Sequence, residues 1–131
     1  MAKLVHSMIR VLDEARSVDF YVQAFGLRIA ERIAFPDFTL VYLHAETGGF
    51  ELELTINHGR TEPYDLGDGY GHLAVVVSNL QAEYDRFVAE GFTVGKLAEL
   101  KNGHMMVARF FFVTDPDGYK IEVIQKGGRF Q

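Results

Sequence analysis

The chain has 131 residues, of which 48% are hydrophobic and 24% charged, and its formal net charge is −5. This length suits one ordinary domain or two very small modules that share a core. The acidic balance gives no reason to expect nucleic acid or an anionic membrane as a partner. Because there is no cysteine, disulfides, thiolate metal ligands and a cysteine nucleophile are excluded. Any metal or acid–base chemistry therefore falls to His, Asp and Glu.

The N-terminal residues lack the apolar core of a signal peptide, and no apolar run approaches the ~20 residues of a membrane-spanning helix. We therefore expect a cytoplasmic protein. Its partner is expected to be a small molecule, with neither nucleic acid nor a membrane involved.

The first half of the chain has the pattern of one strand, one helix and three further strands. Residues 4–11 alternate between an apolar face and a face that carries His6 and Arg10. Asp13 is typical of the start of a helix and Gly26 of its end, with apolar residues at helical spacing between them. The strands that follow are predicted at residues 27–35, 38–43 and 50–56.

The last of these strands carries a carboxylate on its polar face. Leu52 and Leu54 point to one face of this strand, and Glu53 and Asn57 point to the other. Residues 58–71 combine glycines, a proline and several charges, which predicts a linker between two halves.

The second half repeats this order. A strand beginning at His72 precedes a helix that ends at Gly91, and two strands are predicted at residues 92–96 and 106–113, with residues 100–103 interpreted as a loop. The sequence Asp-Pro-Asp-Gly at 115–118 then predicts a hairpin turn into a final strand at 119–124.

Glu122 interrupts this final apolar strand, where an unpaired carboxylate would be costly to bury. An arginine, a metal ion or exposure on the solvated face of the sheet must compensate it. The residues alone leave these three alternatives open.

The two halves therefore form an internal repeat whose matching positions carry chemistry. His6 and His72 each open a half, and Glu53 and Glu122 lie 47 and 50 residues after them in the last strands. The repeat predicts an α+β fold of two tandem βαβββ modules, at about 1–60 and 68–131. The modules form one domain over 1–131, with mixed sheets curling round a common cavity.

Two imidazoles and two carboxylates at matching places predict a site for a divalent transition metal. A single strand histidine is more often a hydrogen-bonded structural residue, and a single strand glutamate is more often solvated. The recurrence of both types in both halves favours ligands. The remaining histidines lie in or beside turns and loops and are interpreted as non-ligands: His44, His58 and His104.

The same segments resemble the glyoxalase I (lactoylglutathione lyase) family of the vicinal-oxygen-chelate superfamily, which includes glyoxalase, bleomycin-resistance and dioxygenase-like proteins. The resemblance extends over residues 6–124. The matching segments are His6 to Val11, Ser17 to Tyr21, Gly26-Leu27, Glu51 to Asn57, Tyr70 to Ala74 and Asp115 to Glu122.

The resemblance implies a homodimer with active sites built from both subunits. It also implies one divalent metal per site, held by His6, Glu53, His72 and Glu122. Because the compact chain lacks the insertions of the longer zinc-using enzymes, the resemblance points to Ni²⁺ or Co²⁺, with Zn²⁺ possible. Glu122 would be the base, and the reaction would isomerise the methylglyoxal–glutathione hemithioacetal to S-D-lactoylglutathione.

The resemblance also implies that Arg10 and Asn57 hold glutathione, the co-substrate. A cross-strand ion pair for Arg10 and a turn at the strand end for Asn57 are the alternatives. The segment from Asn102 to Phe112 is longer and more apolar than the glycine-rich loop of the family pattern. Lys101 is therefore not assigned to the family lysine near the substrate.

Other functions remain open at this point. One class is another metal enzyme of the superfamily, an acyl-CoA epimerase or a thiol transferase. The other is a metal-free small-molecule-binding module, which would not need both histidines and both glutamates.

Overall fold

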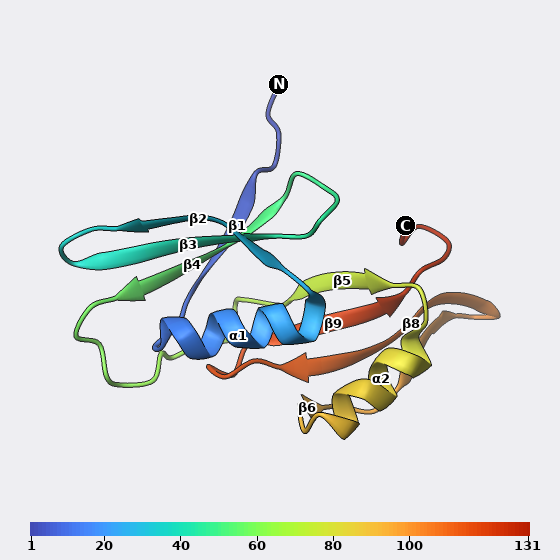
Figure 1. Cartoon of the computed structure of the whole chain (residues 1–131). Helices are drawn as coiled ribbons and strands as arrows, with labels where there is room; N and C mark the ends of the chain where they lie inside the picture. The colour runs from blue at the N-terminus through green and yellow to red at the C-terminus, as the bar shows by residue number, and fades with distance from the viewer. The chain divides into compact units, whose positions relative to one another are not determined.

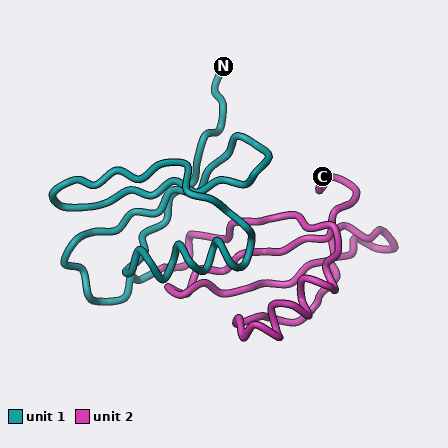
Figure 2. Tube along the Cα trace, in the orientation of Figure 1, with its two compact units in different colours: residues 1–65 teal, residues 66–131 magenta.

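The computed structural model describes residues 1–131 and divides into two compact units, residues 1–65 and 66–131 (Figure 2). Each unit contains one mixed β-sheet and one α-helix (Figure 1). The predicted α+β fold of two βαβββ modules is confirmed. Neither helix has the length and apolar content that crossing a membrane requires.

Unit 1 follows the predicted order of strand, helix and three strands. Its sheet has the order β1-β4-β3-β2, in which β1 and β4 are parallel and the other neighbours antiparallel. Its elements are β1 (His6–Arg10), α1 (Glu14–Phe25), β2 (Arg28–Ala34), β3 (Phe38–His44) and β4 (Glu51–Asn57).

Unit 2 has the same arrangement, with its edge strand in two pieces. The sheet has the order β5-β9-β8-β6, β7 also pairs with β8, and β5 and β9 are parallel. Its elements are β5 (Leu73–Val77), α2 (Leu80–Ala89), β6 (Thr93–Val94), β7 (Ala98–Asn102), β8 (Met105–Thr114) and β9 (Lys120–Gln125).

Local side chains start and stop α1 where the sequence predicts. The Asp13 carboxylate accepts a hydrogen bond from the Arg16 backbone N–H at 2.8 Å, which satisfies a donor that the first turn leaves unpaired. Gly26 ends the helix with φ of 67°, a left-handed conformation that glycine adopts without a steric penalty.

The predicted hairpin turn joins β8 and β9, and Asp115 organises it. The Asp115 side chain is buried, and its Oδ1 accepts hydrogen bonds from the backbone N–H groups of Asp117 and Tyr119, both at 2.9 Å. Gly118 has φ of 97°, a value that side chains disfavour. This turn fixes the register that sets Glu122 opposite Phe112.

In unit 2, α2 packs against one face of the sheet through aromatic rings. Phe111 has no exposed surface and contacts Tyr84 and Phe87 of α2, with ring centroids 5.3 Å and 5.6 Å apart. Burial of one such side chain contributes roughly 1.5–3 kcal/mol. Because neighbouring residues of a strand point to opposite faces, the helix covers the face opposite Phe112 and Glu122.

The prediction of a loop at residues 100–103 was wrong, because β7 occupies residues 98–102. The strand Ala98–Asn102 is largely exposed and rich in polar residues, so it shows no apolar alternation. It forms because β8 supplies hydrogen-bond partners along its length. The dipeptide Asn102-Gly103, a strong hairpin signal, could have revealed this strand.

The strand predicted at 92–96 is only two residues long. β6 and β7 pair with successive parts of β8, and the Gly95 N–H donates to the Phe112 carbonyl at 2.8 Å between them. The two pieces therefore take the place that β2 has in unit 1.

A bidentate ion pair joins α1 to β2. The Arg32 guanidinium donates to both carboxylate oxygens of Glu14, at 2.6 Å and 2.9 Å. This hydrogen bonding holds the pKa of Glu14 below its usual value of 4.5. A carboxylate with a lowered folded-state pKa stabilises the fold above its unfolded pKa, and that contribution disappears as the pH falls through the folded pKa.

We therefore expect Glu14→Gln to lower the thermal midpoint more at about pH 7 than at about pH 3. Thermal unfolding followed by circular dichroism at both pH values measures the difference. Glu46→Gln is the matched control, because the Arg28–Glu46 pair is 3.9 Å long and well exposed and should contribute nothing. Equal effects of Glu14→Gln at both pH values would contradict the expectation.

Candidate functional site

In unit 1 the parallel pairing of β1 and β4 brings His6 to Glu53. Met8 is the register partner of Glu53, and His6 lies two residues earlier on the same face. The His6 Nε2 and Glu53 Oε2 atoms are 3.2 Å apart, with 38% of the histidine side chain and 11% of the glutamate side chain exposed. The carboxylate is thus nearly buried, and the imidazole edge remains accessible.

In unit 2 the parallel pairing of β5 and β9 repeats this geometry. Ala74 is the register partner of Glu122, and His72 again lies two residues earlier. The His72 Nε2 and Glu122 Oε2 atoms are 3.3 Å apart, and the two side chains are 40% and 17% exposed. Each unit therefore holds one imidazole–carboxylate pair at the same place in its sheet.

An aromatic residue on the third strand completes each pair. Tyr42 is the register partner of Glu53, and its ring meets the His6 ring edge to face at 5.8 Å. Phe112 is the register partner of Glu122, and its ring meets the His72 ring at 5.1 Å. Sequence reasoning missed both residues, although the parity of their strands places them on the ligand face.

The two aromatic residues differ by one hydroxyl group. A hydrogen bond from the Tyr42 hydroxyl to Glu53, with a smaller contribution from burial, raises the pKa of Tyr42 to about 12. Phe112 has no polar atom to offer Glu122. The two carboxylates therefore have matching positions and different surroundings.

The donor types in each pair suit a divalent transition metal, which binds imidazole nitrogen and carboxylate oxygen. The ion-pair partner of each carboxylate is its histidine, and no lysine or arginine neutralises either one. No group of three or more metal-binding side chains occurs, so each unit by itself offers two donors. The arrangement of the donors fits half of a four-ligand site in each unit.

Arg10 and Asn57 end β1 and β4 on the face that carries His6 and Glu53. The Asn57 side-chain amide donates to the Tyr64 hydroxyl at 3.1 Å. Arg60 stacks on the same tyrosine ring, with its guanidinium carbon 4.3 Å from the ring centroid. The amide is thus held in place at the end of β4.

The other three histidines belong to neither pair. His58 is engaged by Thr39, with 2.8 Å between Oγ1 and Nε2, and by the Pro36 carbonyl at 3.0 Å from Nδ1. His44 ends β3, and His104 lies in the turn between β7 and β8.

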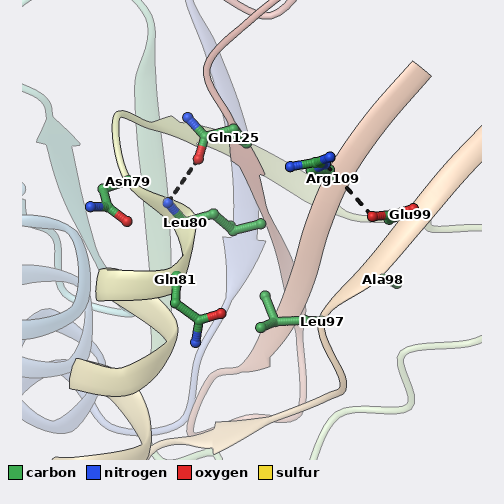
Figure 3. A pocket seen from close by; sticks show the side chains of 8 residues that line it. All are labelled: Asn79, Leu80, Gln81, Leu97, Ala98, Glu99, Arg109 and Gln125. Carbon is green, nitrogen blue, oxygen red and sulfur yellow. Dashed lines mark hydrogen bonds and ion pairs between the residues drawn. The ribbon is translucent and has the colours of Figure 1, made fainter. Parts of the chain in front are cut away.

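A cavity of about 300 Å³ lies elsewhere in unit 2, at the N-terminus of α2 (Figure 3). Its polar groups are already paired, because Gln125 Oε1 accepts from the Leu80 N–H at 2.9 Å and Arg109 lies 3.7 Å from Glu99. Neither His72 nor Glu122 lines it. The two histidine–glutamate pairs therefore lie outside this cavity.

The chain belongs to the Glyoxalase/Bleomycin resistance protein/Dioxygenase superfamily, whose family model matches residues 3–123. It is 42% identical to a lactoylglutathione lyase of Neisseria meningitidis, over 95% of this chain and 91% of that protein. It is 37% identical to a probable lactoylglutathione lyase of Synechocystis, over 96% and 97% of the two chains.

A similar solved structure is that of the trypanothione-dependent glyoxalase I of Leishmania major. It is 30% identical, with a TM-score of 0.79 over 95% of this chain and 87% of that chain. The resemblance read from the sequence segments is thereby confirmed for the family.

Proposed function

We propose that this protein is a lactoylglutathione lyase, which isomerises the hemithioacetal of methylglyoxal and glutathione to S-D-lactoylglutathione. The observation that carries the proposal is the imidazole–carboxylate pair repeated at the same place in both units. Relatives that bear this enzyme's name, and that match almost the whole chain, support the same activity.

His6, Glu53, His72 and Glu122 are the proposed ligands of one divalent ion. When bound, the ion supplies positive charge beside the two neighbouring substrate oxygens as negative charge develops on them. The four side chains would supply two nitrogen and two oxygen donors to the ion. Ni²⁺ or Co²⁺ is the favoured ion, because the compact chain lacks the insertions of the longer zinc-using enzymes that the chain resembles. Zn²⁺ suits the same donor types.

Glu122 is the proposed catalytic base. Its carboxylate takes the proton from the carbon that bears the glutathione sulfur and the hydroxyl group, and returns it to the adjacent carbonyl carbon, while the hydroxyl proton passes to the former carbonyl oxygen. The electron pair of the broken C–H bond moves between the two carbons, so the reaction needs neither oxidant nor reductant. Its register partner Phe112 on β8 offers the carboxylate no hydrogen-bond donor, which leaves a lone pair of Glu122 available for the proton.

Glutathione is the proposed thiol, and Arg10 and Asn57 are its proposed contacts. Glutathione carries carboxylate groups, which a guanidinium binds through charge-assisted hydrogen bonds. The side-chain amide of Asn57 offers a further donor and acceptor. That both residues share the sheet face of the His6–Glu53 pair supports this proposal.

A homodimer with active sites shared between subunits is the proposed assembly. Each unit offers only two donors, so a four-ligand site needs one unit 1 and one unit 2, from the same chain or from two chains. Sedimentation velocity of the purified protein measures the assembly directly. The cytoplasmic location and the absence of nucleic-acid and membrane partners stay predictions.

Metal-stripped protein should be inactive and should regain turnover when titrated with Ni²⁺, Co²⁺ or Zn²⁺. The measurement is the initial rate of thioester formation from the hemithioacetal, for which we expect a kcat above ~10 s⁻¹ with the best ion. Metal binding without turnover would contradict the substrate assignment and would favour another thiol or acyl-CoA epimerisation.

Bound metal, measured by elemental analysis, provides the control for the ligand set. His6→Ala should lose the ion because it removes one of four donors, whereas His44→Ala should retain it because His44 lies outside both pairs. Loss of metal from His44→Ala would show that the ligands were wrongly chosen.

Glu122→Gln should lower kcat by about 10²–10⁴-fold, because the amide cannot accept the proton. Glu51→Gln is the matched control, since Glu51 is a strand carboxylate on the ligand face and is the register partner of His6. Steady-state kinetics and thermal unfolding of both variants separate lost chemistry from lost folding. A near-normal kcat for a folded Glu122→Gln protein would remove Glu122 from the role of base.

Arg10→Gln and Asn57→Ala should each raise KM for the glutathione adduct by about tenfold, with a smaller change in kcat. Such a change marks a group that binds the ground state and the transition state equally. An unchanged KM in both variants would show that the thiol binds elsewhere.

A further inference from the structure

We propose that Arg60 binds a carboxylate of the glutathione adduct, in a site that it forms with Tyr64 and Asn57 where the chain leaves β4. The inference rests on the proposed function and deepens it, because it adds a further contact for the thiol part of the substrate. Arg60 lies in residues 58–71, which the sequence predicts only as a linker.

Tyr64 connects Arg60 to the end of β4. Asn57 shares the sheet face of Glu53, and its Nδ2 atom donates to the Tyr64 hydroxyl at 3.1 Å. The guanidinium carbon of Arg60 lies 4.3 Å from the centroid of the Tyr64 ring, inside the ~6 Å range of a cation–π contact. One tyrosine therefore holds both the amide and the guanidinium.

Backbone carbonyls fix the orientation of the guanidinium. Its Nε atom donates to the Glu62 carbonyl at 2.7 Å, and its Nη2 atom donates to the Pro63 carbonyl at 3.1 Å. The Nη1 atom donates to no group of the chain, so it keeps its N–H groups for a ligand. A side chain that is already held in place loses less conformational entropy on binding, which increases affinity.

No carboxylate of the chain neutralises Arg60. Its hydrogen-bond partners are carbonyl oxygens, whereas Arg32 and Arg86 are each paired with a glutamate. The Tyr64 hydroxyl accepts from Asn57 and still has its own O–H to donate. A cation and a hydroxyl donor together suit a carboxylate, because its hydrogen bonds are strongest with a charged donor.

The amide of Asn57 adds to this definition of the ligand. Since its Nδ2 atom faces Tyr64, its Oδ1 atom is left to accept a hydrogen bond. The group bound here should therefore combine a carboxylate with a neighbouring N–H donor. Each end of glutathione has this combination, remote from the sulfur and from the carbons that react.

A clamp on the loop is the competing explanation for Arg60. Its bonds to the Glu62 and Pro63 carbonyls would then only hold residues 60–64 in shape. Replacing Arg60 would in that case lower stability and weaken every thiol ligand equally. Carboxylate binding predicts instead an effect that depends on whether the ligand has free carboxylates.

The experiment compares glutathione ligands with and without free carboxylates. S-methylglutathione, which cannot form the hemithioacetal, and its diethyl ester are titrated calorimetrically into full-length, Ni²⁺-loaded protein. KM and kcat are then measured for the methylglyoxal–glutathione hemithioacetal. The variants are Arg60→Gln and Tyr64→Phe, and thermal unfolding checks that each folds. Arg129→Gln is the matched control, because Arg129 also lies over an aromatic ring, that of Phe130 at 5.9 Å.

We expect Arg60→Gln to bind S-methylglutathione about tenfold more weakly, the usual effect of losing a charged hydrogen bond. Its affinity for the diethyl ester should stay unchanged. KM for the hemithioacetal should rise by about the same factor with little change in kcat, because the contact is made equally in the ground and transition states.

Tyr64→Phe keeps the ring beneath the guanidinium and removes one donor, so it should weaken S-methylglutathione by about threefold and leave the ester unaffected. It provides the same comparison if Arg60→Gln does not fold. Arg129→Gln should change neither affinity. A selective loss in Arg129→Gln as large as that in Arg60→Gln would show that net charge is responsible, and would overturn the inference.

Equal weakening of S-methylglutathione and its ester in these two variants would assign Arg60 and Tyr64 to the loop alone and overturn the inference. Unchanged affinity for S-methylglutathione would overturn it as well. Either result would leave the lyase function standing. Native protein that binds neither ligand and does not turn over the hemithioacetal would overturn the proposed function, and this inference with it.

Discussion

The parallel pairing of the first and last strands in each unit decides where the chemistry-bearing side chains meet. The register places Met8 beside Glu53 and Ala74 beside Glu122, so a histidine two residues earlier reaches the carboxylate. A slip of one residue would turn the glutamate to the opposite face of the sheet. In unit 2 the turn at Asp115 sets a second register, that of β8 with β9, which places Phe112 beside Glu122.

The hydrophobic core on the other side of the sheet fixes which way the histidine and glutamate side chains point. In unit 2 the rings of Tyr84 and Phe87 pack on Phe111, and this packing fixes which face of β8 is buried beneath α2. The face with Phe112 and Glu122 is therefore the one that α2 leaves uncovered. Burial of aliphatic and aromatic groups thus sets the orientation of the polar site without contributing a polar atom to it.

The duplicated architecture places two carboxylates at equivalent positions beside different aromatic residues. The register partner of Glu53 on β3 is Tyr42, whereas the register partner of Glu122 on β8 is Phe112. The duplication therefore fixes where the two carboxylates lie, and the third strand of each unit sets the polarity of the side chain beside each of them.

The sequence by itself determined the elements with local signals: α1 between Asp13 and Gly26, the turn at Asp115, and the repeat that singled out two histidines and two glutamates. Tertiary structure decided the rest. β7 exists only because β8 pairs with it, since an exposed edge strand with polar residues carries no alternating pattern. Tyr42 and Phe112 became visible only through their registers with Glu53 and Glu122. Strand register joins residues far apart in the chain, and neither periodicity nor turn chemistry encodes it.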